Sequence, residues 1–129
     1  MTTSPSATIK VALADDHAML RECLFNCLTL WGYSVIIQAC NGKNLLDQIS
    51  NENMPDICIL DLNMPVLNGW ETIKVLTKSW PDIKIMVFSM NISGKNDKVA
   101  GAHVTVSKAG GMSDIKESLL RLTKSIEVL

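Results

Sequence analysis

The sequence predicts one α/β domain with a parallel sheet covered by helices on both faces. Two observations lead to this prediction. Segments with a strand pattern alternate with segments with a helix pattern along the chain, and this alternation is typical of a parallel sheet. Two strand segments, residues 57–60 and 83–88, are almost wholly apolar, as expected of strands buried on both faces. The length of 129 residues suits a single domain.

The first half of the chain predicts two strands, each followed by a helix. Residues 9–15 form a short apolar run, and residues 20–31 then place apolar side chains three and four apart, as on one helix face. Gly32 is a suitable helix end. Residues 33–40 predict the second strand, and residues 42–52 the second helix.

The second half continues the alternation. Residues 56–61 predict a third strand, and residues 70–80 carry apolar side chains at helical spacing. Residues 83–89 and 103–108 predict the fourth and fifth strands, and residues 115–126 predict the last helix. We therefore expect the carboxyl ends of five strands along one edge of a sheet.

The composition limits the classes of function. A hydrophobic content of 47% supports a substantial core, and a net charge of −1 argues against a basic nucleic-acid-binding surface in this domain. No apolar stretch is long enough for a membrane span, and the polar N-terminus lacks a secretory signal segment, so we expect a cytoplasmic protein without membrane contact. Residues 1–8 predict a flexible tail, which leaves residues 9–129 as the folded domain.

The four cysteines predict neither a disulfide framework nor a metal site. They are Cys23, Cys27, Cys40 and Cys58. They form no Cys-x-x-Cys pair, and the two histidines lie at no ligand spacing from them. We expect four reduced, mostly buried thiols that act as small apolar residues.

Chemically active side chains stand at the predicted carboxyl ends of four strands. They are Asp15 and Asp16, Asp61, Ser89 and Lys108. Each has an ordinary explanation by itself: Asp15 or Asp16 could cap a helix, Asp61 could cap a loop, Ser89 could begin a turn, and Lys108 could be a solvated surface lysine. Together they favour a site, because ligands of doubly wound sheets bind at this edge.

This set of side chains fits phosphoryl transfer to an aspartate. Clustered carboxylates repel one another unless a cation neutralises them, and oxygen ligands suit Mg²⁺. A carboxylate can also act as the nucleophile toward phosphorus and form an aspartyl phosphate. Lys108 and Ser89 could then bind two of the phosphoryl oxygens.

Several short motifs resemble those of one protein family. They are "ADDH" (14–17), "LDLNMPVLNG" (60–69), "FSM" (88–90), "GA" (101–102) and "SK" (107–108). In order and spacing they resemble the response-regulator receiver domain of two-component signalling, from about residue 8 onward. The residues "DDH" (15–17) and "DLNMP" (61–65) resemble those of the receiver branch that usually carries a C-terminal helix-turn-helix output domain. The resemblance implies a flavodoxin-like sheet of five strands in the order 2-1-3-4-5.

The resemblance also implies roles for the strand-end residues. Asp61 would be the phosphoacceptor, supplied by a histidine kinase or a phosphotransfer protein. The implied ligands of Mg²⁺ are Asp15, Asp16, Asp61 and the backbone carbonyl of Asn63. Ser89 and Lys108 would contact the phosphoryl group. Such a domain is a regulator rather than an enzyme; it could pair as a homodimer and would reach DNA only through an output domain beyond residue 129.

Two features depart from the family pattern. The stretch from Ser89 to Lys108 is shorter than usual, and residues 91–97 are mostly poor helix formers, which predicts a short or irregular fourth helix. Thr105 stands where family members commonly carry an aromatic switch residue, and it cannot act as a bulky rotamer. An alternative is therefore a receiver-fold interaction module with weakened or absent phosphorylation switching. An aspartate-nucleophile phosphatase is less favoured, because the chain has no room for a cap or substrate domain.

Overall fold

A five-stranded parallel sheet forms the centre of the domain, in the order β2-β1-β3-β4-β5. The computed structural model describes residues 8–90 and 99–127. The strands are β1 (Lys10–Ala14), β2 (Ser34–Ala39), β3 (Ile57–Leu60), β4 (Lys84–Ser89) and β5 (Val104–Ser107). This order confirms the predicted doubly wound, flavodoxin-like arrangement.

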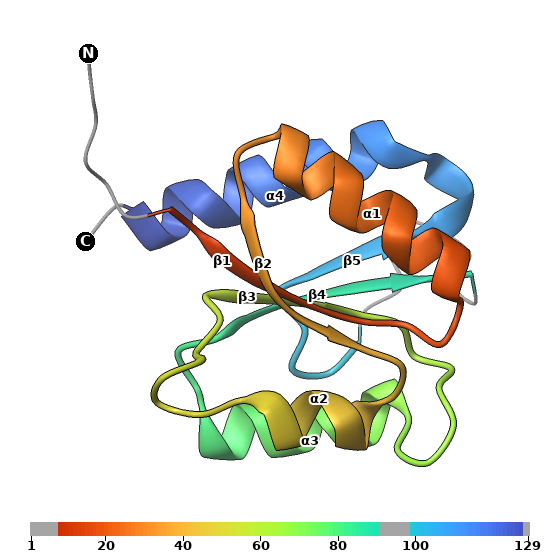
Figure 1. The fold of residues 1–129 in the computed structure, drawn as a ribbon, viewed down its shortest axis with the longest axis vertical. Coiled ribbons are helices and arrows are strands. Elements are labelled where there is room, and N and C mark those ends of the chain that lie inside the picture. The colour runs from red at the N-terminus through yellow and green to blue at the C-terminus, as the bar shows by residue number, and fades with distance from the viewer. Residues whose placement is uncertain (1–7, 91–98, 128–129) are drawn as a thin grey trace.

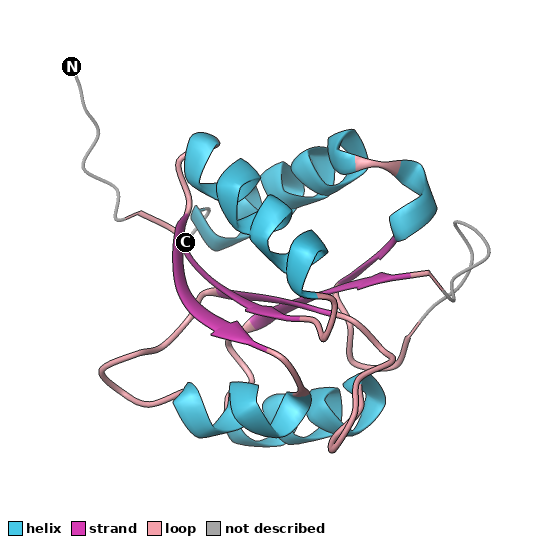
Figure 2. Ribbon diagram, turned by 45° about the vertical axis from the view of Figure 1, so that its right-hand side comes forward, coloured by secondary structure: helices cyan, strands magenta, loops and turns pink. Residues whose placement is uncertain are grey.

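Helices cover both faces of the sheet, as predicted. They are α1 (Ala18–Leu30), α2 (Gly42–Gln48), α3 (Gly69–Ser79) and α4 (Met112–Glu127). Helices α1 and α4 lie on one face and α2 and α3 on the other (Figure 1), and the three layers are also visible in Figure 2. Within the described ranges, no helix has the length and apolar character of a membrane span. The predicted fourth helix falls on residues 91–98, outside the described residues.

The core consists of two apolar clusters, one on each face of the sheet. Successive side chains of a strand point to opposite faces, so β1 contributes to both clusters. Val11 and Leu13 pack on the side of α1 and α4, whereas Ala12 and Ala14 pack on the side of α2 and α3. Strand β3 is buried along its whole length. Its apolar sequence is therefore explained by its central position in the sheet.

The cysteines do not follow the prediction, because only one of the four is buried. Cys58 lies inside β3, where burial raises the pKa of its thiol to about 12. Cys23 and Cys40 are exposed, and Cys27 is half-buried. The expectation of mostly buried thiols is therefore wrong. Helix α1 buries Leu24 and not its cysteines, since its apolar stripe toward the sheet is narrower than the sequence pattern indicates. All four thiols are free.

Candidate functional site

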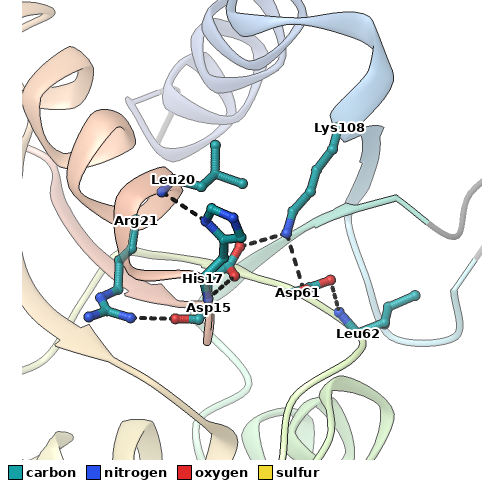
Figure 3. Close-up of polar contacts among 7 residues, drawn as sticks. All are labelled: Asp15, His17, Leu20, Arg21, Asp61, Leu62 and Lys108. Atoms are coloured by element: carbon teal, nitrogen blue, oxygen red, sulfur yellow. Dashed lines mark hydrogen bonds and ion pairs between the residues drawn. The ribbon is translucent and has the colours of Figure 1, made fainter.

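The carboxyl ends of three strands bring two carboxylates and one ammonium group into contact. Asp15 directly follows β1, Asp61 follows β3, and Lys108 follows β5. The Nζ atom of Lys108 lies 2.8 Å from Oδ2 of Asp15 and 3.2 Å from Oδ2 of Asp61. Figure 3 shows the lysine side chain reaching both carboxylates. The three side chains are 10%, 11% and 8% exposed, in the order Lys108, Asp15, Asp61. The alternative of a solvated surface lysine is therefore wrong.

Backbone hydrogen bonds orient both carboxylates. The backbone N–H groups of Asp15 and Asp61 each donate to the end of a neighbouring strand at 3.0 Å. The Oδ1 atom of Asp15 accepts the backbone N–H of His17 at 2.9 Å, and that of Asp61 accepts the N–H of Leu62 at 2.8 Å. Hydrogen bonds to a charged acceptor are stronger than neutral ones. Each carboxylate is thus fixed with its second oxygen on Lys108.

Helix α1 begins with a histidine cap. The Nδ1 atom of His17 accepts the backbone N–H of Leu20 at 3.2 Å, and His17 has the extended backbone of an N-cap residue. The alternative in which Asp15 or Asp16 caps this helix is therefore wrong. Both aspartates are left for the strand-end cluster.

Arg21 is a site residue that the sequence analysis missed. It lies one turn into α1, and its Nη1 atom donates to the backbone carbonyl of Asp15 at 2.6 Å (Figure 3). A signal was available in the sequence, because Arg21 follows Asp15 by six residues at the start of a predicted helix. The pattern alone could not tell that the side chain reaches back to the loop.

The electrostatic balance keeps Lys108 charged. Burial by itself lowers the pKa of Lys108, because it disfavours the ammonium form. The hydrogen bond and charge of Asp15, followed by those of Asp61, outweigh burial, and the pKa of Lys108 lies above its ordinary value of 10.5. The ring of Phe88 adds a cation–π contact, with its centroid 5.7 Å from Nζ.

The carboxylates at this edge form a suitable set of ligands for a divalent cation. One oxygen from each of Asp15, Asp16 and Asp61 lies within 4.8 Å of the other two. Ligands of an octahedral Mg²⁺ lie about 3.0 Å apart when adjacent and about 4.2 Å apart when opposite, so the three oxygens would move closer together around a bound ion. The donors are all hard oxygens, and one ammonium faces three carboxylates. These residues therefore fit Mg²⁺.

The remaining predicted residues lie in or beside the same edge of the sheet. Ser89 is the last residue of β4, is fully buried, and pairs with Ser107 of β5. Asn63 lies two residues after Asp61 and is exposed. Thr105 is half-buried in β5, opposite Val87. The structure places Ser89 at the edge, whereas the functional roles of Ser89, Asn63 and Thr105 remain predictions.

The loop between β3 and α3 is closely packed beneath Asp61. The backbone N–H of Gly69 donates to the carbonyl of Leu62 at 2.9 Å. A Cβ atom on Gly69 would collide with the backbone carbonyl of Asp61 and lie 2.6 Å from Cα of Leu62. Glycine is therefore required where α3 begins. Asn68 and Glu71 form a capping box there.

The fold and the acidic pocket define a receiver-type α/β domain. The profile of the response regulator receiver domain matches residues 11–120, and the chain belongs to this family. It is 33% identical over 120 residues to the chemotaxis protein CheY of Thermotoga maritima. The matched region covers 89% of this chain and 98% of that protein.

Other relatives extend beyond the length of this chain. It is 30% identical over 104 residues to the transcriptional regulatory protein DegU of Brevibacillus brevis, covering 80% of this chain and 42% of DegU. The chain thus spans less than half of that regulator. Among solved structures, the receiver domain of the Francisella response regulator 1452 superposes with a TM-score of 0.81 at 24% identity, covering 93% of this chain and 100% of that domain. At this identity the likeness shows the fold.

Proposed function

We propose that this domain accepts a phosphoryl group on Asp61 from the phosphohistidine of a histidine kinase or phosphotransfer protein. One observation carries the proposal: the ammonium of Lys108 bridges Asp15 and Asp61 at the end of a buried strand, with Asp16 completing a three-carboxylate cluster. Membership of the receiver family supports it. The pocket supplies a nucleophile, a fixed cation and oxygen ligands.

In the proposed reaction, a carboxylate oxygen of Asp61 attacks phosphorus. The bond from phosphorus to the donor histidine nitrogen breaks, and its electron pair leaves with the nitrogen, so an aspartyl phosphate forms. Such transfers depend mainly on positioning and on neutralising the phosphoryl oxygens. Lys108 would exchange its contact with Asp61 for one with a phosphoryl oxygen, and the hydroxyl of Ser89 would donate to another.

Mg²⁺ is the proposed cofactor. The residues that would hold it are Asp15, Asp16, Asp61 and the backbone carbonyl of Asn63. When bound, the ion supplies positive charge to the phosphoryl oxygens. Asp15 and Asp61 already share Lys108, whereas Asp16 is exposed. Asp16 therefore contributes the carboxylate nearest to solvent.

The test is phosphorylation by acetyl phosphate, followed by intact-protein mass spectrometry. Wild-type protein with Mg²⁺ should gain the mass of one phosphoryl group, and removal of Mg²⁺ with EDTA should prevent the gain. Asp61→Asn should remain unmodified. Asp82→Asn is the matched control, because Asp82 is an exposed aspartate between α3 and β4, at the other end of the strands. Wild-type protein that gains no mass with Mg²⁺ would refute the proposal.

The proposed output is a change in a partner protein or in a further domain. The chain matches only part of DegU, a transcriptional regulatory protein. This partial match supports the proposal that any contact with DNA is made by a domain outside residues 9–129. A homodimer is a further proposed partner. We assign a regulatory rather than an enzymatic role, in the cytoplasm. Four free thiols are consistent with that reducing compartment.

A second candidate is an interaction module that does not switch on phosphorylation. Thr105 favours it, because the half-buried position opposite Val87 has no bulky side chain to rotate. Beryllofluoride, which mimics the phosphoryl group, separates the two. A module without switching should bind its partner equally with and without beryllofluoride. A change in oligomeric state or in the amide spectrum of β5 would favour the switching receiver.

A further inference from the structure

Arg21 holds the one peptide that connects two of the clustered carboxylates. Ala14 is the last residue of β1 that pairs with β2 and β3, so the carbonyl of Asp15 lies beyond the sheet ladder. That carbonyl accepts Nη1 of Arg21 at 2.6 Å. It belongs to the peptide between Asp15 and Asp16. The guanidinium therefore sets the plane of the peptide from which Asp16 projects.

The other carboxylates of the cluster have their own restraints. Asp15 is held by Lys108 and by the backbone N–H of His17. Asp61 is held by Lys108 and by the backbone N–H of Leu62. Asp16 is exposed, so its position depends on the backbone that leads into it. Arg21 acts on that backbone.

Arg21 also belongs to the interior of the site. It lines a cavity of about 10 Å³ together with Asp15, Asp61 and Phe88. A cavity of this volume holds at most about one water molecule, so Arg21, Asp15 and Asp61 surround one small space. The half-buried guanidinium is also planar and well suited to directed hydrogen bonds.

We propose that Arg21 is a positioning residue for the Mg²⁺ ligands, and this inference rests on the proposed metal site. The positive charge of Arg21 by itself would repel Mg²⁺ bound nearby and so weaken its binding. A positioning role and a purely electrostatic role therefore predict opposite effects when Arg21 is replaced. Loss of positioning weakens Mg²⁺ binding, whereas loss of charge alone strengthens it.

The experiment is a titration of the full chain with MgCl₂, followed by amide NMR. The amides of His17 and Leu62 report directly, since they donate to Asp15 and Asp61. Arg21→Gln should raise the Kd for Mg²⁺ about tenfold, the lower end of the range for residues that orient metal ligands. Arg21→Lys, which keeps the charge but loses the planar group, should fall between Arg21→Gln and wild type.

The chain offers a matched control in its other arginine. Arg121 pairs with Glu117 at 2.9 Å on the exposed face of α4, where both side chains are more than 70% exposed (73% and 71%). Arg121→Gln should leave the Kd for Mg²⁺ unchanged. Urea unfolding of each variant separates a loss of fold from a loss of positioning.

Three outcomes would overturn the inference. If Arg21→Gln binds Mg²⁺ more tightly, the residue acts only through its charge. If both Arg21 variants are less stable but bind Mg²⁺ as wild type does, its role is structural. If wild-type protein shows no Mg²⁺-dependent shift, the metal site itself is wrong, a failure that the acetyl phosphate assay detects separately in the wild-type chain.

Discussion

The ammonium of Lys108 lies closer to Asp15, at 2.8 Å, than to the proposed acceptor Asp61, at 3.2 Å. The Lys108–Asp15 pair joins the end of the last strand to the end of the first. An ammonium that contacts two carboxylates can leave one of them and still keep a charged partner. The two contacts therefore suit the proposed exchange, in which Lys108 leaves Asp61 for a phosphoryl oxygen and keeps Asp15.

Lys108 should stabilise the fold in a way that fades at high pH. Its folded pKa is raised above 10.5. Its contribution is therefore complete below pH 10.5 and is lost as the pH rises through the folded pKa. Urea unfolding of wild type and Lys108→Met, from neutral pH upward, should show a difference that shrinks above pH 10.5. A difference that stays constant across this range would contradict the ion-pair assignment.

The two neighbouring aspartates should differ in their effect on stability. Asp15→Asn leaves Lys108 and the N–H of His17 with a neutral acceptor, and should lower the free energy of unfolding by about 1–2 kcal/mol. Asp16→Asn, at an exposed position, should stay within about 0.5 kcal/mol of wild type. The measurement is urea unfolding in EDTA. A loss of less than about 0.5 kcal/mol in Asp15→Asn would contradict a stabilising role for its pairing with Lys108.

His103 should make the start of β5 sensitive to acid. The ring Nδ1 of His103 accepts the backbone N–H of Ile85 at 2.9 Å, while the backbone N–H of His103 donates to the Ile85 carbonyl at 2.8 Å. Burial, and then the charge of Lys84, lower the pKa of His103 below 6.5. The neutral ring therefore stabilises the fold fully above pH 6.5, and this contribution is lost as the pH falls through the folded pKa.

The measurement for His103 is the protection factor of the Ile85 amide in hydrogen exchange. In wild type this protection factor should decrease as the pH is lowered from neutral to values below 6.5. In His103→Leu the protection factor should be low at neutral pH and at the lower pH. The Val87 amide, further along β4, is an internal reference. Wild-type protection of Ile85 that does not change with pH would exclude protonation of His103 as the cause.

Val66 should be a source of strain in the loop after Asp61. Its φ of 68° is the only positive value for a non-glycine residue in the described part of the chain. The N–H of Leu67 bonds to the carbonyl of Pro65 at 2.7 Å, which closes a three-residue turn in its strained form. The Val66 side chain is 75% exposed, so burial does not offset the strain.

Val66→Gly should therefore raise the free energy of unfolding by about 1 kcal/mol. The matched control is Val75→Gly, which makes the same change at an exposed position inside α3. It should lower the free energy of unfolding by about 0.5 kcal/mol, because glycine is a poorer helix former than valine. Both are measured by urea unfolding. Destabilisation by Val66→Gly would show that the turn is not strained.

The alternating pattern of the sequence predicted the layers of this protein, and the resemblance to the receiver family implied the strand order that the structure has. Apolar runs mark buried strands regardless of what lies next to them, and each of the five strands was found within about a residue of its predicted range. The strand-end residues Asp15, Asp61 and Lys108 could be identified because parallel strands present their carboxyl ends at one edge. Side-chain burial on α1 was less predictable, as the exposed Cys23 shows.

The order of residues along the chain was enough to predict the inventory of the site: three carboxylates, a hydroxyl and an amine at the ends of four strands. The way in which these groups are held depends on the packing of the folded chain. The contact of Lys108 with Asp15, the cap formed by His17 and the bond from Arg21 each depend on where a side chain points after the strands have packed. Periodicity records the burial of a residue, whereas a polar contact depends on direction and distance in three dimensions.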